Sequence, residues 1–119
     1  QFIVFNGADE QFISGRLIGA DSGIGGTYGV MPELFLKADE YVKSGKFKEA
    51  QELQHDINDI IFSLCSLHGH MYAVIKEILK LKGINIGSVR GPLEPLSEDD
   101  RKPALQIKEL IDATILKYR

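Results

Sequence analysis

The sequence has little of several things that mark particular classes of protein. Its 119 residues include one cysteine, Cys65, so no disulfide can form within the chain, and we expect a cytoplasmic protein. No apolar run exceeds five residues, so we expect no membrane-spanning helix. Basic residues do not predominate, because the formal net charge is −3. Nucleic acid is therefore not an expected partner.

Lysine is absent before Lys37, although the N-terminal third of the chain is where the sequence suggests a site. If an enzyme uses an amine nucleophile at a site in this N-terminal third, the lysine must come from another part of the protein. The chain also opens directly with the apolar run Phe2–Phe5, whereas free termini are usually solvated. We therefore expect it to be part of a longer protein.

The first 27 residues predict a strand, a helix and a second strand. Residues 2–5 form an apolar run that ends at Asn6-Gly7, which is typical of a strand buried on both faces. Residues 9–18 follow with helical spacing and an acidic first turn, and Gly19 closes this helix. The glycine-rich residues 20–27 predict a second strand that runs into a turn. A strand, a helix and a strand in this order demand a parallel pair.

Beyond Met31 the pattern is helical. Ser97 and Asp100 have the spacing of a capping box, and Pro103 is expected to kink or restart the last helix. We therefore predict an α/β part, residues 1–44, and a helical extension, residues 45–119. Apolar side chains, among them Phe47 and Tyr72, recur at helical spacing through this part of the chain. We expect one helix from Pro32 to a stop at Ser44-Gly45, and further helices over 46–67, 70–82 and 97–119. A loop is expected over 84–96.

The turns after the two strands are where chemistry is expected, because active residues of α/β sheets and barrels gather at the carboxyl ends of strands. In the first turn, Asp9 and Glu10 offer carboxylates to the hydroxyls of a polyol; alternatively, they only cap and stabilise the helix start. In the second turn, residues 23–29, glycines allow backbone N–H groups to approach a carboxylate or phosphate; alternatively, they only form a turn.

Two other groupings of reactive side chains are discounted. Cys65 and His68 stand one helical turn apart, but they lie in the helical part, and we expect a buried cysteine with a neighbouring histidine. His68 and His70 lack a third ligand at useful spacing, so we expect a helix junction and no metal site.

Two motifs together resemble a known family. The segment Phe5-Asn6-Gly7-Ala8-Asp9-Glu10 and the segment Gly19-Ala20-Asp21-Ser22-Gly23-Ile24-Gly25-Gly26-Thr27-Tyr28 resemble the seventh and eighth barrel strands of the N-acetylneuraminate lyases. These enzymes belong to the dihydrodipicolinate synthase/N-acetylneuraminate lyase family of class I pyruvate aldolases. Residues 87–96 resemble the loop before the last helix in this family. The resemblance covers essentially the whole chain, but only the C-terminal portion of the family.

The resemblance implies an α/β fold that is the C-terminal part of a TIM (β/α)₈ barrel, with the last two βα units followed by an α-helical tail. It implies cleavage of sialic acid to N-acetylmannosamine and pyruvate through a Schiff base, with no metal or organic cofactor, in a homo-oligomer that is usually a tetramer. The lysine on the sixth strand and the tyrosine from an earlier strand are not in this chain. No catalytic residue is therefore expected here, and the N-terminal part of the barrel is the implied partner.

What the resemblance carries over is substrate binding. The first turn is implied to hold the hydroxyl-rich part of the sugar, and the second turn to line the pyruvate end. One position of the second turn is a glycine where well-known lyases carry a serine that contacts the substrate. The six implied substrate-binding residues are Gly7, Asp9, Glu10, Ile24, Gly25 and that glycine, Gly26.

Two alternatives stay open. One is a dihydrodipicolinate-synthase-like enzyme, or another aldolase with a different 2-keto acid. The other is a non-catalytic half-barrel that acts only by association, which the exposed strand edges of a lone strand–helix–strand unit favour.

Overall fold

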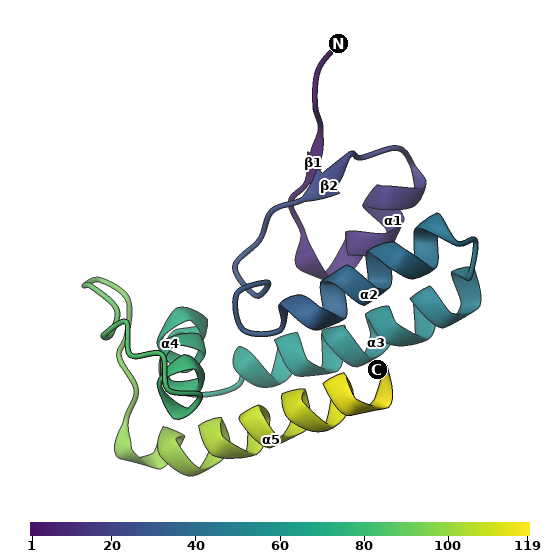
Figure 1. The fold of residues 1–119 in the computed structure, drawn as a ribbon. Coiled ribbons are helices and arrows are strands. Elements are labelled where there is room, and N and C mark those ends of the chain that lie inside the picture. The colour runs from purple at the N-terminus through teal and green to yellow at the C-terminus, as the bar shows by residue number, and fades with distance from the viewer.

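The computed structural model describes residues 1–119 and shows a small parallel sheet followed by a stack of helices (Figure 1). The chain forms β1 (Phe5–Asn6), a 3₁₀ turn η1 (Asp9–Gln11), α1 (Phe12–Leu17), β2 (Ser22–Gly23), α2 (Pro32–Lys43), α3 (Phe47–Leu64), α4 (Met71–Leu81), a 3₁₀ turn η2 (Glu98–Asp100) and α5 (Arg101–Lys117). None of the helices combines the length and apolar composition needed to cross a lipid bilayer.

The two strands are parallel, as the order strand, helix, strand predicts. Phe5 pairs with Ser22 and Asn6 pairs with Gly23. The predicted burial of the first strand is wrong: Phe2 is 93% exposed and Phe5 is 54% exposed. A parallel strand is buried only where neighbours cover both faces. Here, β1 has β2 on one side and contacts α1, and no other strand lies beside it.

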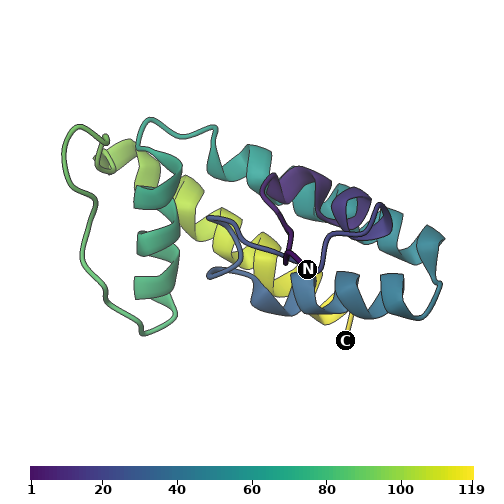
Figure 2. The same ribbon diagram turned by 90° about the horizontal axis from the view of Figure 1, so that it is seen from above.

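The helices form close to where the apolar pattern predicts them. Figure 2 shows α4 running across one end of the longer helices α3 and α5. Helix α5 is continuous from Arg101 to Lys117, and Pro103 lies in its first turn. The N–H groups of a first turn have no partner within the helix, so proline is tolerated there. Ser97 and Asp100 form the predicted capping box ahead of it. Phe47 differs from its prediction: it begins α3 and is 55% exposed.

One hydrophobic cluster joins the sheet-bearing part to the helices. Helix α3 lies at its centre and contacts α1, α2, α4 and α5. Residues from α1 through α5 contribute to the same buried cluster, so the turns after β1 and β2 rest on the helical extension. The 19 buried apolar residues of the cluster are Phe12, Ile13, Val30, Met31, Leu34, Phe35, Ala38, Ala50, Leu53, Ile57, Ile60, Ile61, Leu64, Val74, Ile75, Ile78, Ala104, Ile107 and Ile111.

Candidate functional site

The parallel pairing brings the turns after β1 and β2 to the same edge of the sheet. The Ile24 N–H donates to the Asn6 carbonyl at 3.0 Å, so the pairing extends into the second turn. Asp9, in the first turn, then reaches across to Thr27 in the second. The sequence therefore correctly predicts that these two turns lie together.

Asp9 is the link between the two turns. Its carboxylate is buried, and its Oδ2 atom accepts hydrogen bonds from the Thr27 backbone N–H at 2.9 Å and from the Thr27 hydroxyl at 2.6 Å. Ala8, and not Asp9, occupies the N-cap position of η1, and no side chain caps that turn. The main role of the Asp9 side chain in this chain is thus to join the turns.

Gly25 packs directly against the Asp9 carboxylate. A Cβ atom on Gly25 would lie 1.6 Å from Asp9 Oδ1, a distance that no side chain tolerates. Glycine is required here for close approach and not for an unusual φ, because its φ is not positive. The Oδ1 atom receives no hydrogen bond from the chain and faces the glycine turn.

Glu10 points elsewhere than Asp9. Its side chain is exposed and lines a surface cavity of about 540 Å³ between α1 and α3, which is also lined by Leu17, Phe47 and His55. Its backbone carbonyl accepts a hydrogen bond from the Asn58 side-chain amide at 3.3 Å. Within this chain, the two adjacent carboxylates do not converge on one cavity.

The remaining expected residues surround the glycine turn. Gly7 is exposed, with open space where a side chain would stand, and Ile24 is 69% exposed. Gly25 and Gly26 are half-buried. The expected binding residues of the second turn therefore combine one exposed apolar side chain with two backbone segments that a ligand can approach.

Two contacts between the turns and distant helices are not predicted by the sequence. Gln54 of α3 is buried; its Oε1 accepts the Ile13 N–H at 3.1 Å, and its Nε2 donates to the Asp9 carbonyl at 3.1 Å. Tyr72 of α4, predicted as part of an apolar stripe, is 41% exposed, and its ring lies against Gly26. Both residues lie on helices whose sequence signal is only the helical period, which does not report a polar contact to a distant turn.

The histidines and the cysteine of the helical part do not form a reactive site. Cys65 is exposed, contrary to the prediction, and desolvation and the charge of Glu10 raise the pKa of its thiol, which disfavours the nucleophilic thiolate. No group of three metal-ligating side chains occurs in the chain. The prediction of a helix junction at His68 and His70 is confirmed, since His70 is the N-cap of α4.

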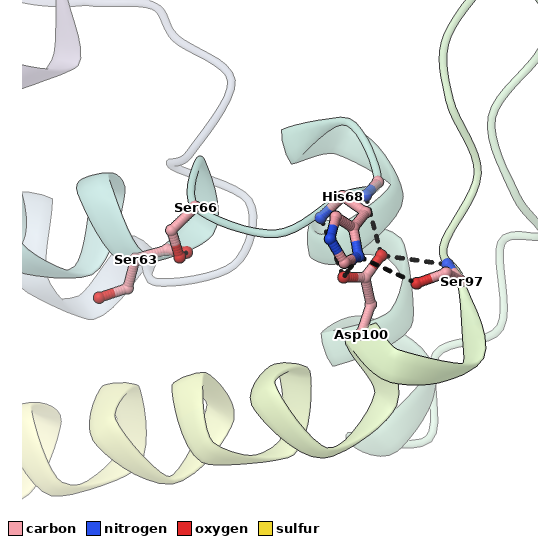
Figure 3. Close-up of polar contacts among 6 residues, drawn as sticks. Ser63, Ser66, His68, Ser97 and Asp100 are labelled. Carbon is pink, nitrogen blue, oxygen red and sulfur yellow. Dashed lines mark hydrogen bonds and ion pairs between the residues drawn. The ribbon is translucent and has the colours of Figure 1, made fainter.

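Ser97, His68 and Asp100 lie together, but not as a catalytic triad (Figure 3). The same ring nitrogen, His68 Nδ1, faces Ser97 Oγ at 3.5 Å and Asp100 Oδ1 at 3.6 Å, whereas a triad uses one nitrogen for each partner. The Asp100 carboxylate instead accepts backbone N–H groups of His68, Gly69 and Ser97 at 2.8–3.0 Å. The cluster therefore fixes the α3–α4 connection to the start of α5.

Comparison with known families agrees with this geometry. The profile of the dihydrodipicolinate synthetase family matches residues 1–113. The chain belongs to this family. It is 52% identical over 112 residues to an N-acetylneuraminate lyase of Mediterraneibacter gnavus, an alignment that covers 93% of this chain and 36% of that protein. The chain thus spans about a third of the length of this curated relative.

Solved structures give the same result. A wild-type sialic acid aldolase of Ruminococcus gnavus superposes with a TM-score of 0.97 at 50% identity, over 99% of this chain and 40% of that one. A catalytic lysine mutant of the same protein superposes equally well. The N-acetylneuraminate lyase of Fusobacterium nucleatum in complex with pyruvate superposes with a TM-score of 0.74 at 31% identity, over 98% of this chain and 36% of that one. The chain resembles part of a sialic acid aldolase.

Proposed function

We propose that residues 1–44 are the last two βα units of a (β/α)₈ barrel and that residues 45–119 are its helical extension. An N-terminal part supplies the other strands, and the complete barrel is a cytoplasmic homo-oligomer. The apolar, exposed start of β1 supports this, because a neighbouring strand would cover it. The parallel pairing of β1 and β2 also supports it, because all eight strands of such a barrel are parallel.

We propose that the complete protein cleaves sialic acid to N-acetylmannosamine and pyruvate. The observation that carries this is the identity of about half of the residues to an N-acetylneuraminate lyase and to a sialic acid aldolase, in matches that cover nearly the whole chain. The amine that forms the Schiff base is proposed to come from outside this chain, because neither β1, β2 nor the turns after them contain a lysine. The proposed reaction needs no metal and no organic cofactor.

The two turns supply substrate binding in this proposal. Gly7 and Asp9 are proposed to face the hydroxyl-rich part of the sugar, with Asp9 Oδ1 free of hydrogen bonds within the chain while Oδ2 holds Thr27. Glu10 is proposed to join them, which requires its side chain to turn away from the cavity between α1 and α3 that it lines in this chain. In the second turn, Ile24 and Gly25 line the pyruvate end, and Gly26 lies beside the substrate without a side chain to contact it. Rigid positioning of such groups lowers the entropic part of the barrier for the bond that breaks.

The test uses the protein expressed from its complete gene. With sialic acid as substrate, pyruvate release is followed by its reduction with lactate dehydrogenase and NADH, and we expect steady pyruvate production. Borohydride added with pyruvate is expected to trap a covalent adduct on a peptide outside the 119 residues described here. No release and no trapping would overturn the proposal; an adduct within these residues would overturn the assignment of the nucleophile.

A second candidate is a dihydrodipicolinate-synthase-like activity, which the family that matches residues 1–113 favours. Both reactions use pyruvate, but their second substrates differ. The synthesis direction is therefore run with pyruvate and either N-acetylmannosamine or aspartate semialdehyde. Consumption of only the semialdehyde would select the second candidate, and trapping without activity on either would select another 2-keto acid. Inactivity without trapping would favour a half-barrel that acts by association.

A further inference from the structure

A buried glutamine of α3 holds the backbone of the first turn. Helix α3 contacts both η1 and α1, and Figure 2 shows α1 lying against it. Gln54 is 5% exposed at this contact. Its Oε1 accepts the Ile13 N–H at 3.1 Å, and its Nε2 donates to the Asp9 carbonyl at 3.1 Å. One side chain thus binds residues on both sides of the junction between η1 and α1.

Gln54 takes the place of a helix cap for α1. The first N–H groups of a helix have no partner within it. Gln11 precedes α1 and makes no side-chain cap, so the Ile13 N–H depends on Gln54. The Asp9 carbonyl accepts the Phe12 N–H of its own turn, and Gln54 adds a second bond to it. Loss of the Gln54 amide would therefore leave a buried N–H unpaired and loosen the turn that carries Asp9.

Asn58, one helical turn further along α3, extends this contact. Gln54 Nε2 also donates to Asn58 Oδ1 at 2.9 Å, and Asn58 Nδ2 donates to the Glu10 carbonyl at 3.3 Å. Asp9 and Glu10 therefore present consecutive carbonyls to two side-chain amides four residues apart. An amide has one acceptor oxygen and two N–H groups, so the Ile13 donor and the two carbonyl acceptors allow only one orientation of both amides.

Asp9 is held at both its backbone and its side chain by these contacts. Gln54 binds its carbonyl, and its carboxylate Oδ2 binds Thr27. A shift of the backbone would also move the Oδ1 atom, which faces the glycine turn. Binding groups need a position that is fixed to within about 0.5 Å by packing and supporting hydrogen bonds. The buried Gln54 amide supplies such a support to the first turn.

We propose that Gln54 and Asn58 are positioning residues for the sugar end of the substrate, which act through the backbone of Asp9 and Glu10 and not by contact with the substrate. This inference rests on the proposed function. Both amides bond to the first turn alone, whereas the second turn is proposed to line the pyruvate end. The two side chains are therefore expected to affect binding of the sugar much more than binding of pyruvate.

The test uses the protein from its complete gene and measures sugar and pyruvate binding separately. Gln54→Met fills similar space without polar groups, and KM for sialic acid is expected to rise about tenfold with a smaller change in kcat, because a displaced group binds the sugar less well. The pyruvate concentration for half-maximal borohydride trapping is expected to change less than about twofold. Gln51→Met removes an exposed amide from the preceding turn of α3 and is the matched control, expected to change neither value.

A second variant keeps the test decisive if thermal unfolding shows that Gln54→Met does not fold. Asn58→Ala removes the donor to the Glu10 carbonyl from a half-buried position, and KM for sialic acid is expected to rise about threefold with trapping unchanged. Unchanged KM in the folded variants, or an equal loss of sugar binding and of pyruvate trapping, overturns this inference alone. A wild-type protein inactive on sialic acid overturns the proposed function, and this inference with it.

Discussion

Asp9 and Thr27, which follow different strands, are joined by two hydrogen bonds to a single carboxylate oxygen. Thr27 is 1% exposed and Asp9 is 6% exposed, so water does not replace these bonds if one partner is lost. A buried charge without its partners is costly, which makes this pair a point where stability and the shape of the proposed site depend on each other.

Thr27→Val tests this link. Valine keeps the shape but removes the hydroxyl that donates to Asp9 at 2.6 Å, so we expect a loss of about 2 kcal/mol in the free energy of unfolding, measured by urea denaturation. Thr27→Ser keeps the hydroxyl and is expected to cost only the buried methyl group, about 1 kcal/mol. Equal losses in the two variants would show that the hydrogen bond contributes little.

Gly25→Ala tests the close approach of the second turn to Asp9. The added Cβ must displace the carboxylate, and we expect a loss of about 3 kcal/mol from strain and weakened hydrogen bonds. Gly29→Ala is the matched control in the same loop, since nothing lies within 4 Å of its Cβ position. Its unfolding free energy is expected to change by less than about 0.5 kcal/mol. A stable Gly25→Ala variant would contradict the packing described here.

Asp100→Asn tests the anchor of the α3–α4 connection at acid pH. Burial raises the pKa of Asp100, but hydrogen bonds from Ser97, Gly69 and His68 outweigh it and lower the pKa to about 2. A carboxylate with a lowered folded-state pKa stabilises the fold above its unfolded pKa, and this contribution is lost as the pH falls from about 4 to about 2. We expect Asp100→Asn to flatten the pH dependence of unfolding in that window.

The control for this prediction is Asp99→Asn, which removes a neighbouring exposed carboxylate. Its pH dependence is expected to follow the wild type, because the hydrogen bonds to Asp100 remain. Identical curves for Asp100→Asn and Asp99→Asn would contradict the anchoring role.

Tyr28→Phe tests a buried hydroxyl without a hydrogen-bond partner. The ring stacks on Phe35 at 4.0 Å between centroids, and phenylalanine preserves this stacking. Burial, and then the charge of Asp9, raise the pKa of Tyr28 to about 12, and the nearby Asn6 side chain offsets part of this rise although its geometry does not make a hydrogen bond to the hydroxyl. Its neutral form is thus favoured in the folded state, so stability is lost as the pH rises from about 10 to about 12.

For Tyr28→Phe we expect a gain of about 1 kcal/mol near neutral pH, because the cost of burying an unpaired hydroxyl disappears. Its stability is also expected to fall less between about pH 10 and 12 than that of the wild type. Tyr41→Phe serves as the comparison. Lower stability of Tyr28→Phe at neutral pH would show that the hydroxyl has a partner in the complete protein.

The sequence predicts the helices and the meeting of the two turns, because both depend on local period and on chain order. Gly45 and Gly83 follow α2 and α4 with positive φ, where the pattern places the helix stops. The capping box of Ser97 and Asp100 is likewise confirmed, since its signal lies within four residues. The assignment of the six site residues to substrate contacts stays a prediction.

What the sequence does not predict is where long-range polar contacts form. Gln54 lies among apolar neighbours on α3, yet it pairs with Asp9 and Ile13 more than 40 residues away in the chain. Tyr72 follows the period of the apolar stripe, yet it is exposed against Gly26. The spacing of apolar residues shows which face of a helix is buried. It does not show which side chain at the border of that face contacts a distant turn.

The shared core of the sheet-bearing part and the helices also has a consequence for gene shuffling. Gln54 binds the backbone of the first turn, and the buried residues of α3 pack on α1 and α2. A recombinant that takes residues 1–44 from one homologue and 45–119 from another therefore cuts through one packed interior. Crossovers between these segments should succeed only between parents whose α3 side chains match the first turn and α2, so the two segments are expected to be inherited together.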